Sequence, residues 1–392
     1  MKNLILMLAI CPVLVAPVSG LLAVPSASAR TVVDVTGTGV QKTSVEIRVA
    51  NPAFANCLRR NLELTGLFVV QAQGSIKVTG ASGSIRADGP NRALPMTMPF
   101  SDDRSARMAA RRASDAICQA FGGQKGFAQD PVLFLNRGRT PAKGVAIPAE
   151  LCTSYPDGMD IRQLTNDGKM IIFQRWMMDR ENVLYISDKN GATQIWQMNI
   201  VTGQRKVKWS FKGTPTGIAV SPDGNRVAAI LSFQGNPELY VLDMGRDNWR
   251  RMTNTPYDVE GQPTWSPDGS QIAFVRGVNS QQIWVVNVAT GKERRLTSKG
   301  RKNVDPDWGA NGQIAYVSGA HVAVMDVAKG DASSRNVAEA AKWEHPSWSC
   351  DGRHLVASRN KALFVIDTLE GGDKPRQMFQ ANGNWIAPCW AK

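Results

Sequence analysis

The sequence predicts a mainly β protein, a six-bladed β-propeller preceded by a small α+β domain. A repeat of about 40 to 45 residues begins near residue 131, and such a period is typical of propeller blades. All 11 tryptophans lie at or beyond Trp176. The last segment, residues 384–392, reproduces the start of a repeat without its continuation. We expect a signal peptide at residues 1–29, the small domain at 30–127 and the propeller at 128–392.

Residues 1–29 have the features of a cleavable export signal. Lys2 is their only charge, an apolar run from Leu4 to Val18 follows, and Ala27-Ser28-Ala29 is a small-x-small cleavage site. A membrane anchor is the competing interpretation, but prolines and a glycine interrupt the run and no stop-transfer flank follows. No later stretch approaches membrane-spanning length. We therefore expect an exported, soluble protein without a membrane span, cleaved after Ala29.

The chain is basic, with 46 Lys and Arg against 33 Asp and Glu, a net charge of +13. In a cytosolic protein this excess would indicate nucleic acid. In an exported protein it fits anionic envelope polymers or acidic protein surfaces, and we expect no nucleic-acid partner. The basic residues are spread along the chain, so a solubilising role is the plainer interpretation.

The small domain is predicted to contain strands at 31–35 and 44–49 and two helices. Asn51-Pro52 is a cap followed by a first-turn proline, and Gly66 ends the first helix. The second helix begins after Ser101 and ends at Gly122. Four arginines on it could bind an anion, but a solvated helix face is the simpler expectation: Arg104, Arg107, Arg111 and Arg112.

Each repeat unit contains two positions at which an aromatic residue recurs in most units, and we call them the first and second stations. The first, the tryptophan of a Pro-x-Trp motif, falls at Trp176, Val220 (a substitute), Trp265, Trp308, Trp348 and Trp390. A turn follows it, as in Ser266-Pro267-Asp268-Gly269, and the next strand begins. The second station, on a later strand, falls at Cys152, Trp196, Tyr240, Trp284, Ala323 and Phe364. Four strands per repeat make a propeller blade.

The two stations are out of phase at the chain ends, and this predicts how the ring closes. Residues 131–165 supply three strands that have no innermost strand before them. The terminal sequence "IAPCW" supplies an innermost strand with no outer strands after it. Pairing the two would complete the sixth blade and remove an unpaired strand edge from the ring.

Export permits disulfides, but cleavage would remove Cys11 and leave an odd number of cysteines. Cys57 and Cys118 each lie on a predicted helix, and whether they pair is left open. Cys152 and Cys389 are predicted two strands apart in the sixth blade, and Cys350 lies in a turn of the fifth. A Cys152–Cys389 bridge is not expected, because next-but-one strands are about 9–10 Å apart. A Cys350–Cys389 bridge is not expected either, because Cys389 is in the middle of a strand of the next blade.

The segments "ASDAICQAFGGQKGFAQDPVLFL" and "ANCLRRNLELTGLFVV", together with the divided sixth blade, resemble the TolB family of periplasmic translocation proteins. The resemblance implies a non-enzymatic, monomeric hub of the Tol–Pal envelope system. It implies a TolA-like partner for an N-terminal arm, Arg30, Thr31, Val32, Val33, Asp34 and Val35. An extended arm can add to a partner's sheet edge, although an ordinary edge strand of its own domain remains an alternative.

The resemblance also places a Pal-like peptidoglycan-associated lipoprotein on one end of the propeller. In a four-stranded meander the connections between blades share one face with the loops between second and third strands. The predicted contact residues in these connections are Thr214, Gly217, Glu260, Gln262, Asn303, Asp305, Glu344, His345, Asn384 and Trp385.

Two other functions remain open. The first is a propeller that binds a saccharide or another envelope protein. The second is a hydrolase or lyase of propeller type, but the sequence has no Gly-x-Ser-x-Gly elbow and no Cys-x-x-Cys or His-x-x-x-His spacing. We therefore expect no catalytic residues, no metal and no cofactor.

Overall fold

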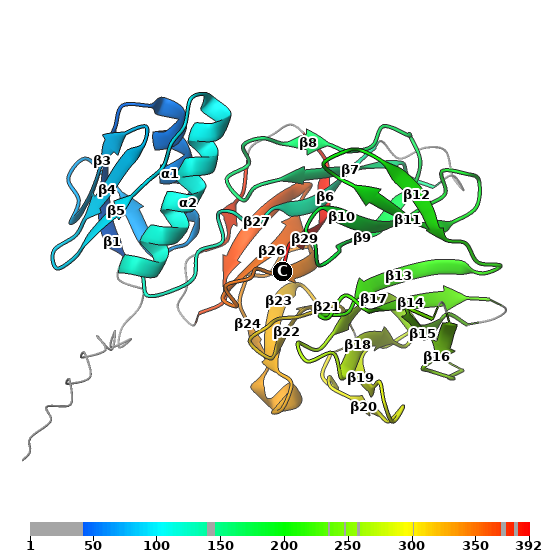
Figure 1. Ribbon diagram of the computed structural model, residues 1–392. Helices are drawn as coiled ribbons and strands as arrows, with labels where there is room; N and C mark the ends of the chain where they lie inside the picture. Colours follow the sequence, from blue (N-terminus) through cyan, green and yellow to red (C-terminus); the bar gives the residue numbers. More distant parts are fainter. Residues whose placement is uncertain are drawn as a thin grey trace, which may run out of the picture. The chain divides into compact units, whose positions relative to one another are not determined.

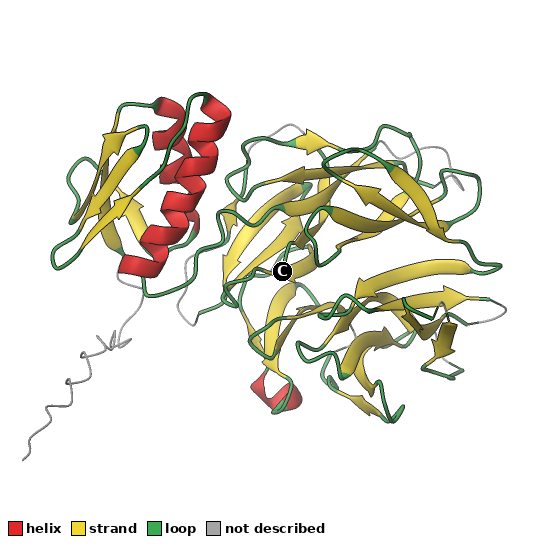
Figure 2. Cartoon of the chain, viewed as in Figure 1, coloured by secondary structure: helices red, strands yellow, loops and turns green. Residues whose placement is uncertain are grey.

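The computed structural model describes residues 42–138, 146–233, 236–246, 248–256, 259–300, 302–369, 374–379 and 383–392. The predicted signal peptide, the strand expected at 31–35 and the predicted N-terminal arm lie outside these residues. The chain is mainly β, as Figure 2 shows, with two long helices near the start of its described part. Within that part, no helix is both long and apolar enough to cross a membrane.

The α+β unit contains a five-stranded sheet of order β2-β1-β3-β4-β5 and two helices (Figure 1). Its strands are β1 (Thr43–Val49), β2 (Phe68–Val70), β3 (Ile76–Ala81), β4 (Ser84–Asp88) and β5 (Ala93–Met96), and its helices are α1 (Pro52–Leu64) and α2 (Asp103–Phe121). The Asn51 side chain accepts a hydrogen bond from Phe54 N at 2.8 Å, and Asp102 forms a capping box with Ser105. The predicted helix starts are therefore confirmed.

The propeller consists of six four-stranded antiparallel sheets. Blade one contains β9 (Ile171–Trp176), β10 (Asn182–Ser187), β11 (Gln194–Asn199) and β12 (Arg205–Trp209). Blade two contains β13 (Thr214–Val220), β14 (Arg226–Ser232), β15 (Glu238–Asp243) and β16 (Asn248–Arg251). Blade three contains β17 (Val259–Trp265), β18 (Gln271–Arg276), β19 (Gln282–Asn287) and β20 (Glu293–Arg295).

The remaining blades follow the same order. Blade four contains β21 (Asn303–Trp308), β22 (Gln313–Ser318), β23 (His321–Asp326) and β24 (Arg335–Asn336), with the short helix η1 (Gly330–Ser333) before its last strand. Blade five contains β25 (Trp343–Trp348), β26 (His354–Arg359), β27 (Ala362–Asp367) and β28 (Arg376–Gln377). Blade six has the order β29-β6-β7-β8, from β29 (Trp385–Trp390), β6 (Val132–Arg137), β7 (Ala149–Ser154) and β8 (Arg162–Gln163).

Every predicted first station is the last residue of a first strand, from Trp176 in β9 to Trp390 in β29. The turns that follow reverse the chain in a left-handed conformation. Gly269 supplies it in blade three with φ 66°, and Arg180 supplies it in blade one with φ 56°. The turn at residues 177–180 of blade one, with the sequence "MMDR", therefore reverses the chain in the same way without a glycine.

The ring closes as the phase of the repeat predicts. In β29, Trp390 pairs with Val132 and Trp385 pairs with Asn136 of β6. Ala391 N also donates to Pro131 O at 3.0 Å. The Trp390 side chain is 1% exposed, packs against Phe127 and donates its indole N–H to the carbonyl of Asp130, just before β6. The first and last strands of the propeller thus share one blade.

Neighbouring blades are also joined by side chains that precede the first stations. Thr264 Oγ1, Asp307 Oδ2 and Ser347 Oγ each accept a hydrogen bond from the backbone N–H of the first-station tryptophan one blade further on. These three contacts connect blades three, four, five and six in series.

The five cysteines in the described residues are free thiols. Cys57 and Cys118 are buried but not bonded to each other, so the structure contains no disulfide between the helices. Cys152 on β7 and Cys389 on β29 are separated by β6, as predicted.

Candidate functional site

The two ends of the propeller ring are formed by different strand ends and connections. We call the end where the first strands begin the inter-blade face. There Thr214 of β13 pairs with Ser232, at the end of β14, and Asn303 of β21 pairs with Ser318, at the end of β22. We call the other end, where the first stations and their turns lie, the turn face. Eight of the ten predicted partner-contacting residues lie at the inter-blade face, because each belongs to the first half of a first strand or immediately precedes it. The other two, Gly217 and Gln262, are the middle residues of β13 and β17.

A bulge near the start of the first strands shapes the inter-blade face. The pairing register shifts there, and Phe173, Asp305, His345 and Ala387 have φ between 49° and 53°. Non-glycine residues rarely adopt this conformation, and such strain gathers at functional sites. One consequence is visible in blades four and five, where His345 N donates to Asp305 Oδ2 at 3.1 Å and the two side chains lie close together. The structure thus brings these two predicted residues together.

Several other predicted residues are parts of the framework. Asn303 is 1% exposed and donates to Gln282 Oε1 and Lys299 O. Gln262 is buried and accepts a hydrogen bond from Arg175. Trp385 is buried and packs edge-on against Phe134. The side chains of these three residues therefore pack inside the propeller and are not available to a partner at the inter-blade face.

Gly217 is also structural, because a Cβ there would lie 2.3 Å from Gly261 O. Thr214, in the same strand, is exposed at the rim. For Glu260 the structure describes the backbone, which pairs with Val275.

Glu344 and Asn384 line a cavity of about 590 Å³ that opens on the inter-blade face between blades five and six. We call this cavity the basic pocket; its polar side chains are Arg137, Lys342, Glu344, Asn360, Lys361 and Asn384. Two of these residues, Glu344 and Asn384, are predicted contact residues. The hairpin residues Asn360 and Lys361 are not among the predicted residues, although the loops between second and third strands were expected on this face.

At the turn face, the ends of the first strands surround a cavity of about 230 Å³. Its walls include four first-station tryptophans, Trp176, Trp265, Trp308 and Trp390. Lys392 Nζ lies 2.8 Å from Asp307 Oδ1 and donates to Trp308 O, so the last side chain reaches from the end of β29 to blade four. Within the described residues, no group of three or more His, Cys, Asp or Glu side chains is arranged to hold a metal ion.

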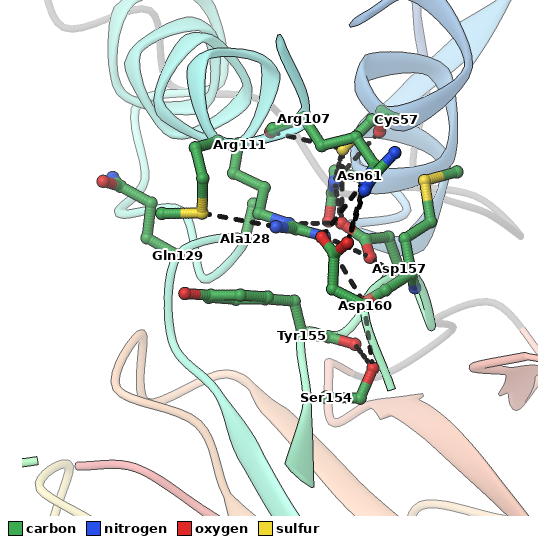
Figure 3. Close-up of polar contacts among 12 residues, drawn as sticks. Cys57, Asn61, Arg107, Arg111, Ala128, Gln129, Ser154, Tyr155, Asp157 and Asp160 are labelled. Carbon is green, nitrogen blue, oxygen red and sulfur yellow. Dashed lines mark hydrogen bonds and ion pairs between the residues drawn. The ribbon is translucent and has the colours of Figure 1, made fainter. Parts of the chain in front are cut away.

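The α+β unit contacts the turn face of blade six through a buried ion-pair network, shown in Figure 3. We call this network the joint. Arg111 of α2 and Asp157 of the β7–β8 turn are both fully buried, and Arg111 Nε lies 2.7 Å from Asp157 Oδ2. The Arg111 guanidinium stacks over Tyr155 at 3.9 Å, and Asn61 of α1 donates to the same Asp157 oxygen. The expected solvated helix face is therefore wrong for Arg111.

Arg107 adds a second, half-buried pair to the joint, because its guanidinium contacts Asp160 at 2.6 Å. Burial alone would raise the pKa of Asp160, but hydrogen bonds from Arg107 and Arg111 and their charges lower it. Burial and the charge of Asp157 raise the pKa of the Cys57 thiol, so Cys57 is a neutral donor to this network. Of the four helix arginines, Arg104 and Arg112 are exposed as expected.

Blade five also contacts the α+β unit. His354 is buried, with Nδ1 2.5 Å from Asp351 Oδ2 and Nε2 2.9 Å from Thr65 O, the carbonyl of the residue that caps the end of α1. Burial would raise the pKa of Asp351, but the charge of His354 and hydrogen bonds hold it well below its usual range. The two ring nitrogens of His354 thus connect the turn of blade five with the end of α1.

These features define a class of protein: a six-bladed propeller closed by its two ends, with an α+β unit on its turn face. A family profile described as TolB beta propeller domain matches residues 119–392. The chain therefore belongs to the TolB beta propeller domain family.

Solved structures share the fold. TolB from Acinetobacter baumannii is 23% identical, with a TM-score of 0.77 over 90% of this chain and 98% of that chain. A putative TolB from Agrobacterium tumefaciens is 18% identical, with a TM-score of 0.50 over 65% and 90%. Hydrazine synthase from Kuenenia stuttgartiensis is 15% identical, with a TM-score of 0.54 over 68% of this chain and 47% of that chain. At these identities the similarity concerns the fold alone, and the same fold occurs in an enzyme, hydrazine synthase.

Proposed function

We propose that this protein is a non-enzymatic interaction hub of the Tol–Pal system in the periplasm. Its inter-blade face would bind a Pal-like peptidoglycan-associated lipoprotein. Its N-terminal arm, residues 30–35, would bind a TolA-like inner-membrane protein. Membership of the TolB beta propeller domain family supports this proposal.

The observation that carries the proposal is the different use of the two ends of the ring. The turn face of blades five and six contacts the α+β unit through Asp157, Asp160 and His354. The inter-blade face carries strained, polar first-strand residues such as Asp305 and His345. Strained polar residues on a rigid sheet scaffold are typical of a recognition surface.

The test is recovery of partners from the periplasmic envelope fraction with the tagged full-length protein. We expect a lipoprotein with a peptidoglycan-binding domain to be recovered and identified by mass spectrometry. Thr214→Arg places a bulky cation on the inter-blade face and should lower the recovery of this lipoprotein about tenfold, which corresponds to about 1.4 kcal/mol.

Val201→Arg is the matched control, because Val201 is 67% exposed in the β11–β12 turn of the turn face. Recovery that falls equally in both variants would contradict the assignment of the face. Recovery of saccharide alone, or turnover in a screen with peptides and glycans, would contradict the proposed hub.

A further inference from the structure

We propose that the basic pocket binds an acidic segment of a protein partner. This inference rests on the proposed function for the identity of the partner, but the pocket and its charge are features of this chain. The pocket opens on the inter-blade face, where blade five meets the blade that closes the ring.

The charge of the pocket is the first argument. Three cationic side chains, Arg137, Lys342 and Lys361, line it together with a single carboxylate, Glu344. Glu344 lies 3.8 Å from Lys342. Within the described part of the chain, neither Arg137 nor Lys361 has a carboxylate partner, and both are exposed. A concave site with excess positive charge focuses its field and attracts anionic groups.

The backbone gives a second, independent argument. Arg359 and Ala362 pair across the β26–β27 hairpin, and both loop residues are left-handed, Asn360 with φ 51° and Lys361 with φ 67°. Such turns strongly prefer Asn-Gly, so asparagine is expected at the first position and lysine is not expected at the second. The neighbouring blade stabilises this conformation, because Trp385 N donates to Lys361 O at 3.1 Å. A lysine at a strained position on a pocket rim, where glycine would fit without strain, is consistent with a role for its charge.

The shape and polarity of the pocket favour a protein segment as the occupant. Two side-chain amides, Asn360 and Asn384, lie among the cations and can donate to or accept from a peptide backbone. The half-buried side chain of Ile386 adds an apolar patch to the same lining. A segment with carboxylates flanking a small apolar residue would match all three kinds of group.

The experiment measures binding of a fluorescent, glutamate-rich peptide to the full-length protein. The comparison peptide has each glutamate replaced by glutamine. We expect the glutamine peptide to bind about tenfold more weakly, and the affinity of the glutamate peptide to fall steeply with added salt. Lys361→Glu and Arg137→Glu should each weaken glutamate-peptide binding about tenfold.

Lys292→Glu is the matched control, because it makes the same charge change in the exposed β19–β20 turn on the turn face. Circular dichroism and thermal unfolding of each variant separate loss of binding from loss of fold. Equal binding of both peptides, or binding insensitive to Lys361→Glu, would overturn the inference. Binding of a uronic-acid oligosaccharide in place of the peptide would overturn the choice of a protein segment.

The experiments can contradict either the hub function or the binding role of the basic pocket without contradicting the other. If Lys361→Glu leaves recovery of the lipoprotein unchanged, the basic pocket is not its contact, while the hub function stands. If no lipoprotein is recovered but the peptide binds in a Lys361-dependent way, the pocket stands and the assignment of the partner fails.

Discussion

The ring closure and the joint both bring together residues far apart in this chain, and the two contacts differ in chemistry. At the ring closure, β29 pairs with β6 through a backbone ladder, and Trp390 fills the apolar space beneath it. At the joint, helix α2 contacts the β7–β8 turn through ion pairs, of which Arg111–Asp157 is fully buried. Burial of apolar surface stabilises the ring closure. The stability of the joint depends instead on buried charges, which are costly unless they remain paired.

Breaking the ring closure should have the largest effect. A chain ending at residue 383 lacks β29, so β6 and the interior of blade six become exposed. Trp390 alone is expected to contribute about 3–5 kcal/mol, judged from truncation of large buried side chains. We expect loss of cooperative thermal unfolding for the truncated chain. A melting temperature equal to that of the full chain would show that the pairing of β29 with β6 is dispensable.

Breaking the joint should come next. Arg111→Met leaves Asp157 buried without its main partner and should cost about 3–5 kcal/mol. The double variant Arg111→Met with Asp157→Leu removes both charges and should recover most of that loss. Chemical denaturation of both variants gives the two free energies of unfolding. A double variant as unstable as the single one would mean that the packing of Arg111, and not its charge, stabilises the joint.

Acid should weaken the half-buried part of the joint by a smaller amount. The folded pKa of Asp160 is lowered, so its contribution is present above the unfolded value of about 3.9 and is lost as pH falls through the folded pKa. Because this pair is partly exposed, we expect about 1 kcal/mol or less. Asp160→Asn should lower the melting temperature at pH 7 and have little effect at the acid end. If the melting temperatures of Asp160→Asn and the wild-type protein differ by the same amount at every pH, the effect comes from packing of the side chain and not from its charge.

The smallest expected effect is a gain. Lys361→Gly relieves a left-handed lysine, but the greater chain entropy of glycine offsets part of this gain, so the protein should be stabilised by roughly 0.5 kcal/mol. The same change removes a cation from the basic pocket, so it should weaken binding of the glutamate peptide while raising the melting temperature. A rise in melting temperature together with weaker peptide binding would show that Lys361 serves binding, whereas the residues of the ring closure and the joint serve stability. A variant that loses both would indicate that Lys361 mainly stabilises the β26–β27 hairpin.

The sequence predicted the ring closure but not the joint, and the reason is physical. A repeat unit must satisfy local rules of turn chemistry and alternation, so the phases of Trp390 and Cys152 are visible in the chain itself. Arg111 lies off the apolar stripe of its helix, which is the pattern of a solvated residue, and no local rule connects it with Asp157. Lys361 is similar, because its left-handed conformation depends on the neighbouring strand β29.

The position of β29 also has a consequence for the order of events during synthesis. The ribosome makes β6, β7 and β8 before any strand of blades one to five, and it makes β29 after all of them. Throughout elongation, the hydrogen-bonding edge of β6 that β29 will cover has no native partner. A chaperone that shields this edge, or faster synthesis that shortens its exposure, should therefore raise the yield of folded protein.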